Sequence, residues 1–319
     1  MMVFMSESAR DTTAPRRVNW RRVLLFYGMA LGWVIVVALA LQLAGQGSFM
    51  TGAMSQLAVM VIAVFYMPAP LVSALIVDRL DGRRPLITTT FAGFGRKLPK
   101  LLLAGTVFLL VTLVAMLALS WLLGSLLGVP GVGRLIADDA GLVANIETVM
   151  GAPADSAPLA LPGVWVLLGL VMVASIVAGF TTNGLFAFGE EYGWRGWLAD
   201  ELRPLGAVRA NLLTGVMWGL WHTPLILQGF NFYPYNYVGP VFMVLLCIPF
   251  SFLLWRVRDL TGSLLAPAVL HGIFNAFIGI FVVALVDRNP LVGAPVGVVG
   301  AAAVAIVAML FWLIPARTA

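Results

Sequence analysis

Apolar stretches of about 20 residues without a charged side chain recur along the chain, and they constrain its fold more than any other feature. A helix of that length rises ~1.5 Å per residue and so crosses ~30 Å of hydrocarbon. Only 10% of the 319 residues are charged and 61% are hydrophobic, which leaves too few charges to cover a soluble domain. Because lipid offers the backbone no hydrogen bonds, spanning segments form helices. The sequence therefore predicts an all-α fold, a polytopic transmembrane helical bundle of about eight spans.

The expected spans cover about residues 23–43, 54–77, 101–127, 161–188, 208–229, 238–255, 263–286 and 291–314. Pro68 and Pro70 are expected to kink the second of them, because proline removes a helix hydrogen bond and clashes with the preceding turn. The chain shows no internal repeat of the kind found in transporters.

Basic residues set the expected orientation. With the N-terminus inside, all of the 19 Lys and Arg residues except Arg134 and Arg288 fall on the cytoplasmic face, as the positive-inside rule requires. Seven spans stay an alternative, since an odd number would move only Arg317 outside. We expect a multi-pass cell-membrane protein with both termini in the cytoplasm. The preference for Arg over Lys indicates a GC-rich genome, and we expect a bacterial one. The net charge of +5 then reflects topology and lipid contact, not binding to nucleic acid.

Ionisable side chains beside apolar spans are costly and usually functional. Here they fall in three motifs, which are Glu190-Glu191 followed by Arg195, Trp218 followed by His222, and His271 followed by Asn275. Counted along unbroken helices from the nearest cytoplasmic charges, the first Glu and the two His lie ~15, ~20 and ~18 Å deep. The three motifs are therefore expected to meet in one layer of the membrane.

Spacing within the motifs indicates chemistry. Glu191 and Arg195 are four residues apart and can pair on one helix face, which leaves Glu190 as the titratable carboxylate. His271 and Asn275 share a face for the same reason. A carboxylate can take a proton from water, and imidazole or amide groups can stabilise an oxyanion. We therefore predict a hydrolytic site, opening toward the cytoplasm.

The motifs EExxxR, aromatic-xxx-His and HxxxN, in this order, resemble those of the CPBP intramembrane proteases. That family includes the CAAX-processing endopeptidases and bacterial Abi proteins, and the matching stretch is about 160–280. The resemblance implies that Glu190 activates water with help from His222, and that His271 and Asn275 stabilise the oxyanion. It implies an endopeptidase, a hydrolase acting on a membrane-associated peptide or protein that a lipid can anchor.

The resemblance also implies that Glu191 and Arg195 form a supporting ion pair. The family often has Phe in place of Trp218, a difference expected to alter packing and not chemistry. We divide the chain into a disordered cytoplasmic tail at 1–18, N-terminal transmembrane helices with an outer loop at 19–157, and CPBP-like catalytic helices at 158–319.

Other interpretations stay open at this point. Glu190, His222 and His271 could instead bind zinc or another divalent metal. A metal-free site is our first choice, because a zinc site would leave the already paired Glu191 as the base. A proton-coupled transporter could use the same groups as a relay, and a non-catalytic bacteriocin-immunity-type protein could use them for binding. The single cysteine, Cys247, excludes an intrachain disulfide and a zinc cluster built from cysteines.

Overall fold

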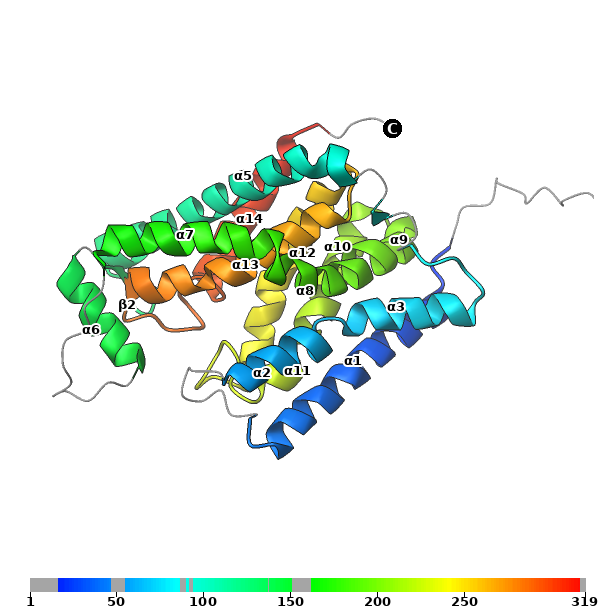
Figure 1. The fold of residues 1–319 in the computed structure, drawn as a ribbon, viewed down its shortest axis with the longest axis horizontal. Coiled ribbons are helices and arrows are strands. Elements are labelled where there is room, and N and C mark those ends of the chain that lie inside the picture. The colour runs from blue at the N-terminus through cyan, green and yellow to red at the C-terminus, as the bar shows by residue number, and fades with distance from the viewer. Residues whose placement is uncertain are drawn as a thin grey trace, which may run out of the picture.

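The computed structural model describes residues 17–46, 55–86, 90–91, 94–136, 138–150 and 162–315. The tail predicted at 1–18 lies outside these residues, except for its last two. The described part of the chain is almost entirely helical, so the all-α prediction is confirmed (Figure 1).

The N-terminal elements are α1 (Trp20–Leu43), α2 (Gln56–Val61), the π-helical turn η1 (Ile62–Tyr66), α3 (Ala69–Leu80), α5 (Phe94–Ser120), the π-helical turn η2 (Trp121–Leu126), β1 (Arg134–Leu135) and α6 (Asp139–Met150). The C-terminal elements are α7 (Val164–Phe180), α8 (Thr182–Glu191), the π-helical stretch η3 (Tyr192–Leu198), α9 (Ala199–Leu202), the 3-10 turn η4 (Arg203–Leu205), α10 (Ala207–Trp221), α11 (Thr223–Ile226), α12 (Gly239–Thr261), α13 (Leu265–Ala284), β2 (Leu285–Val286) and α14 (Val298–Leu313). The two short strands pair antiparallel.

Several helices are suited to cross a membrane. Four described helices are long and apolar enough, namely Trp20–Leu43, Gln56–Leu80, Leu98–Leu126 and Gly239–Thr261. A fifth candidate is the pair Val164–Phe180 and Thr182–Leu205, which is bent by 51°. Leu265–Phe281 and Val298–Leu313 are shorter apolar helices. The molecule is therefore a multi-pass helical membrane bundle. The count of eight stays a prediction, because it requires the shorter helices and α10 to cross as well.

Two predicted spans differ from the structure. The segment 161–188 was expected as one unbroken helix, but it breaks at Thr181, whose φ of −123° and ψ of −107° are not helical. The segment 208–229 ends its first helix at Trp221, and Pro224 lies in the first turn of the short helix that follows. Proline cannot continue the hydrogen bonds of the preceding helix, so His222 lies at a helix end and not in mid-helix. The second segment is interrupted at η1 and Pro68, as its prolines predicted.

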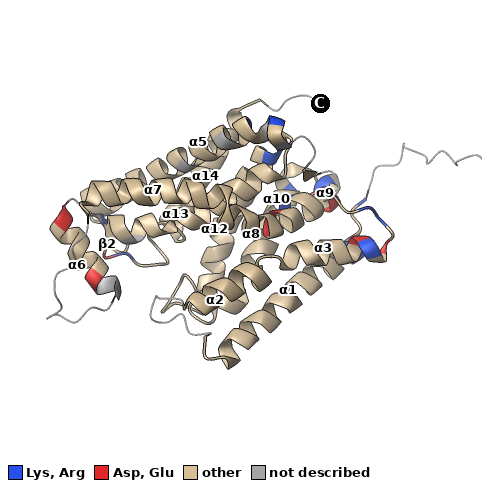
Figure 2. Cartoon of the chain, viewed as in Figure 1, with Lys and Arg blue, Asp and Glu red and all other residues tan. Residues whose placement is uncertain are grey.

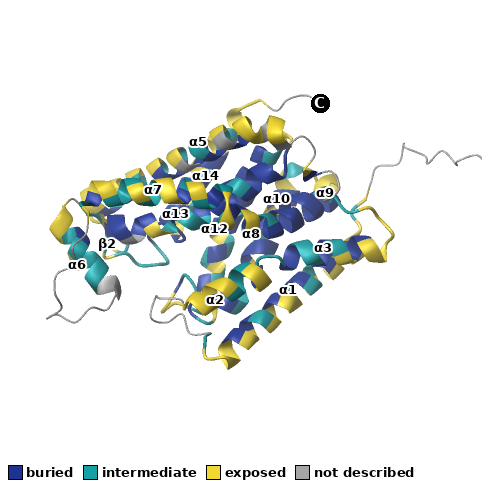
Figure 3. Ribbon diagram, viewed as in Figure 1, coloured by how far each residue is buried: buried dark blue, intermediate teal, exposed yellow. Residues whose placement is uncertain are grey.

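Charge and burial follow the pattern of a membrane bundle. Figure 2 shows basic residues gathered at the end of the molecule where α3 and α9 lie, and a middle with few charges apart from the acidic residues of α8. Figure 3 shows buried residues where α10, α12 and α13 meet, and exposed ones on the outer faces of α1, α5 and α7. Those outer faces carry large apolar side chains such as Leu24 and Trp165, which suits contact with lipid. We call the end with α3 and α9 the basic end.

Glycines let α3 lie directly against α8 and η3. A Cβ atom at Gly193 would lie only 2.3 Å from the Cβ of Pro70, and one at Gly189 only 2.9 Å from the Cα of Pro68. Real Cβ atoms do not approach other atoms so closely. The absence of side chains at these two positions therefore permits a tight seam between the second segment and the helix that carries Glu190.

Replacing Gly193 with Ala is expected to lower the free energy of unfolding by about 1–3 kcal/mol, because overpacking forces the backbones apart. Thermal unfolding in detergent measures the change. Gly279→Ala in α13 is the matched control, since a Cβ there would meet nothing within 4 Å. Equal melting temperatures for the two variants would show that the seam is not tight.

Candidate active site

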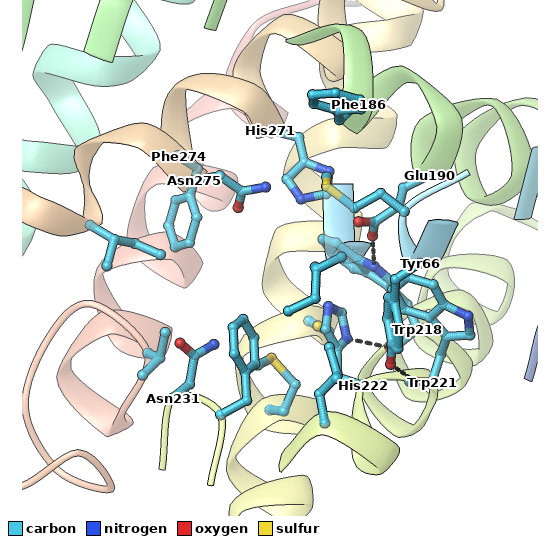
Figure 4. Close-up of a pocket in the computed structure, with 18 of the residues that line it drawn as sticks. Tyr66, Phe186, Glu190, Trp218, Trp221, His222, Asn231, His271, Phe274 and Asn275 are labelled. Carbon is cyan, nitrogen blue, oxygen red and sulfur yellow. Dashed lines mark hydrogen bonds between the residues drawn. The ribbon is translucent and has the colours of Figure 1, made fainter. Parts of the chain in front are cut away.

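The four residues predicted to be catalytic line one cavity of about 310 Å³ (Figure 4). Glu190 comes from α8, His222 from the end of α10, and His271 with Asn275 from α13. Most of the remaining lining is apolar or aromatic, and α2, η1 and α12 supply much of it. The structure thus brings together residues from three distant parts of the sequence, as their similar calculated depths predicted.

The carboxylate of Glu190 is held by a tryptophan. The indole Nε1 of Trp218 donates a hydrogen bond to Glu190 Oε2 at 2.8 Å, and the Glu190 residue is only 3% exposed. The guanidinium carbon of Arg195 lies 4.0 Å from the centre of the same indole ring, a cation–π contact. Trp218 therefore contributes a hydrogen bond as well as packing, because phenylalanine has no N–H to donate.

One carboxylate oxygen of Glu191 contacts two donor groups. Arg195 Nη1 lies 2.9 Å and His271 Nδ1 lies 2.8 Å from Glu191 Oε1, and all three side chains are buried. The ion pair predicted from the four-residue spacing is present. The contact with His271 could not be predicted from spacing, since 80 residues separate the two groups.

The hydrogen-bond partners assign the tautomers of both histidines. His222 Nδ1 lies 2.8 Å from the carbonyl oxygen of Trp218, which can only accept, so Nδ1 carries a proton. His271 Nδ1 faces a carboxylate oxygen, and the same assignment follows. In the neutral form each ring therefore has its lone pair on Nε2. Such a nitrogen can accept a proton from water, but it donates to an oxyanion only when the ring is doubly protonated.

Sequence motifs did not indicate three further polar residues of the cavity. The hydroxyl of Tyr66 donates to the carbonyl oxygen of Trp221 at 2.7 Å and so braces the chain immediately before His222. Asn183 and Asn231 present amides to the same cavity. Tyr66 lies in an apolar span without a motif, and Asn231 lies in a loop, so neither position carried a recognisable signal.

The donor set does not fit a three-ligand metal site. Within the described ranges, no three His, Cys, Asp or Glu side chains are grouped closely enough to hold a metal ion. Glu190 directs one carboxylate oxygen to Trp218, and each histidine uses Nδ1 for a protein partner, so only the other carboxylate oxygen and the two Nε2 atoms are left to bind a ligand. The proposed ligands Glu190, His222 and His271 are not grouped closely enough to form such a site in this structure.

The lining of the cavity extends from Glu190 away from the basic end. Its lining continues from Glu190 to the start of the second segment at Val59, to the loop residue Asn231, and to Val296 before α14. These positions lie at the ends of their helices remote from Arg79 and Arg203, which belong to the basic end.

Fold and site together define a multi-pass helical membrane protein with a buried carboxylate and two histidines around one cavity. Residues 163–277, which carry all of these groups, match the family described as Type II CAAX prenyl endopeptidase Rce1-like. The resemblance to CPBP proteases inferred from the motifs is thereby confirmed.

A curated relative agrees with this assignment. A stretch of 48 residues is 44% identical to CAAX prenyl protease 2 of Methanococcus maripaludis. The stretch covers 15% of this chain and only 17% of the relative's length. The relative's activity is therefore carried over only as a proposal.

Proposed function

We propose that the chain is an intramembrane endopeptidase of the CAAX-protease type, which hydrolyses a peptide bond of a membrane-associated peptide or protein. The observation that carries the proposal is the buried Glu190 carboxylate, fixed by Trp218 and facing a cavity that it shares with His222, His271 and Asn275. A carboxylate so placed is suited to act as a general base on water.

In the proposed mechanism, Glu190 takes one proton from a water molecule whose oxygen attacks the carbonyl carbon of the peptide bond. His222 Nε2 accepts a hydrogen bond from the other O–H of that water and so orients it. The electron pair of the carbonyl bond moves to oxygen and forms the oxyanion. When the tetrahedral intermediate collapses, the carbon–nitrogen bond breaks, and the amine leaves with the proton that Glu190 had taken.

Donors for the oxyanion are supplied from α13. Asn275 can always donate a hydrogen bond to the oxyanion, because its amide NH₂ group does not have to gain a proton first. His271 donates from Nε2 only as an imidazolium, and that positive charge would be balanced by Glu191, whose oxygen already contacts Nδ1. With His271 charged, two carboxylates and two cations (including Arg195) leave the buried cluster neutral, which lowers the cost of burying it.

Cleavage of a fluorogenic peptide library by detergent-purified protein tests the proposal. The library pairs lipidated with unlipidated peptides, and wild type is compared with His222→Ala, each with and without a chelator. We expect wild-type cleavage that His222→Ala loses and that chelation leaves intact. Cleavage lost on chelation would instead establish a metal requirement. If folded wild type cleaves no peptide, the protease proposal fails, and flux driven by a pH gradient in liposomes would then examine the transporter alternative.

Replacing Trp218 with Phe is expected to lower kcat by roughly 10- to 150-fold and to leave KM little changed, because a hydrogen bond to a charged group is worth about 1.5–3 kcal/mol. The variant keeps an aromatic ring beside Arg195 and loses only the N–H directed at Glu190. Steady-state kinetics of the two variants would measure the split between kcat and KM. Trp312→Phe is the control, since its indole N–H donates to the backbone oxygen of Phe252 away from the cavity. A kcat equal to that of the control would remove Trp218 from the mechanism.

A further inference from the structure

The tautomer of His222 depends on how α10 ends. In a continuous α-helix the carbonyl oxygen of Trp218 would accept the backbone N–H of His222, four residues further on. Here the N–H of His222 bonds instead to the carbonyl oxygen of Gly219 at 3.2 Å, so the last turn is of the 3-10 type. The oxygen of Trp218 is thereby left to accept the proton on Nδ1 of the His222 ring. The lone pair on Nε2, which the proposed mechanism uses, therefore requires the helix to end at this residue.

Two groups keep α10 from continuing as an α-helix. Pro224 has no N–H with which to extend the hydrogen bonds of the helix. The carbonyl oxygen of Trp221 would next accept the N–H of Leu225, but that N–H bonds to the carbonyl oxygen of His222 at 3.2 Å. Within the described part of the chain, the hydroxyl of Tyr66 takes its place and donates to the oxygen of Trp221 at 2.7 Å. Tyr66 thus satisfies a buried carbonyl at a helix end, which would otherwise be costly to leave unpaired.

Tyr66 is held firmly in the position from which it donates. It is the last residue of η1 and only 1% exposed. Its ring centre lies 4.5 Å from that of Trp221, and both residues line the cavity of Glu190 (Figure 4). Because the ring is packed on the same residue whose carbonyl it bonds, the hydroxyl has little freedom to choose another acceptor.

We propose that Tyr66 is a positioning residue for His222. Its hydroxyl keeps α10 ended at this histidine and so leaves the carbonyl of Trp218 free to fix the tautomer with the proton on Nδ1. The effect on peptide cleavage rests on the proposed function, whereas the effect on the His222 ring does not. Tyr66 lies outside residues 163–277, which match the family, so the N-terminal part of the chain supplies part of the geometry of the site.

Nitrogen NMR of the histidine rings tests the proposal without any need for catalysis. The chain has only two histidines, so protein labelled with ¹⁵N-histidine gives two sets of ring signals, and His222→Ala assigns them. Tyr66→Phe removes the hydroxyl and keeps the ring. Tyr27→Phe is the matched control, since its hydroxyl donates to the carbonyl oxygen of Met217 in the same helix at 3.1 Å. That oxygen lies inside α10 and also accepts the backbone N–H four residues on, and Tyr27 is not among the residues that line the cavity.

We expect the neutral ring of His222 to carry its proton on Nδ1 alone in wild type and in Tyr27→Phe. In Tyr66→Phe the N–H of Leu225 should take the freed carbonyl of Trp221, and the helix should continue. The oxygen of Trp218 then returns to the backbone N–H, and the ring should show a mixture of tautomers. With a cleavable peptide, kcat of Tyr66→Phe should fall by about tenfold, a part of what general acid–base catalysis contributes. KM should be little changed, and Tyr27→Phe should keep both constants.

A single tautomer with the proton on Nδ1 in folded Tyr66→Phe, as in the control, would overturn the proposal. So would a wild-type His222 ring with its proton on Nε2, a result that does not depend on the folding of any variant. A mixture of tautomers with an unchanged kcat would overturn the role of Tyr66 in the reaction. If wild type cleaves no peptide, the proposed function fails, and the NMR spectra still decide whether Tyr66 positions His222.

Discussion

Replacing Glu190 with Gln is expected to lower kcat by about 10²–10⁴-fold, the contribution usual for a general base. Glutamine has the same shape, and its amide oxygen can still accept the N–H of Trp218, so the cavity should keep its geometry. It cannot take a proton from water, which is the step assigned to Glu190. Single-turnover cleavage of a fluorogenic peptide in detergent measures the loss, and a melting curve of the same sample verifies that the variant is folded.

The matched control is Glu147→Gln, which makes the same chemical change in α6, away from the cavity. Its turnover should equal that of wild type. A turnover rate in Glu190→Gln equal to that of wild type would contradict the assignment of Glu190 as general base, although the protein would still be a protease.

Replacing Glu191 with Ala is expected to cost about 3–5 kcal/mol in the free energy of unfolding, because removal of one partner leaves a buried charge without compensation. Arg195 is 1% exposed, and Glu191 is its ion-pair partner. The same change removes the acceptor of His271 Nδ1, so activity should fall along with stability. Thermal or chemical unfolding in detergent would show the loss as a lower melting temperature.

The double variant Glu191→Ala with Arg195→Met separates charge from packing. It removes the isolated cation and keeps a long apolar side chain against Trp218. It should be more stable than the single variant, since replacing a whole buried ion pair is far less costly than breaking it. If Glu191→Ala has the same melting temperature as wild type, the ion pair contributes nothing to the stability of the fold and its assigned role is wrong.

The sequence predicted the parts of the site that depend on local helix geometry. Glu191 and Arg195 pair as their four-residue spacing requires, and His271 lines the cavity together with Asn275 one turn further on. The break at Thr181 does not change the count of residues between Glu190 and the basic end, because it precedes Glu190. The prediction that the three motifs meet in one layer therefore did not depend on an unbroken helix there. The family assignment held for the same reason, since its motifs are local patterns.

What the sequence did not predict depends on contacts between distant helices. The N–H of Trp218 reaches Glu190, and His271 reaches Glu191, only because α8 packs on α13 while α12 packs on both α10 and α13. Tyr66 enters the site from the second segment, which carries no charged group near it. The close packing of α3 on η3 was not predicted, because hydropathy cannot show where glycines let two helices touch. The number of spans, the domain division and the orientation stay predictions.

The π-helical stretch η3 has a consequence for how the gene can change. A π-helical turn holds one residue more than an α-helical turn and can be viewed as a single-residue insertion. Here it separates Glu190 and Glu191, which face the site, from Asp200 and Glu201, which bind Arg258 and Arg22 on other helices. Loss of one codon within 192–198 would restore an ordinary helix and turn everything after it by about 100°, so that only one of the two sets of contacts could be kept. We therefore expect descendants of this chain to tolerate point substitutions in η3 far more often than in-frame deletions.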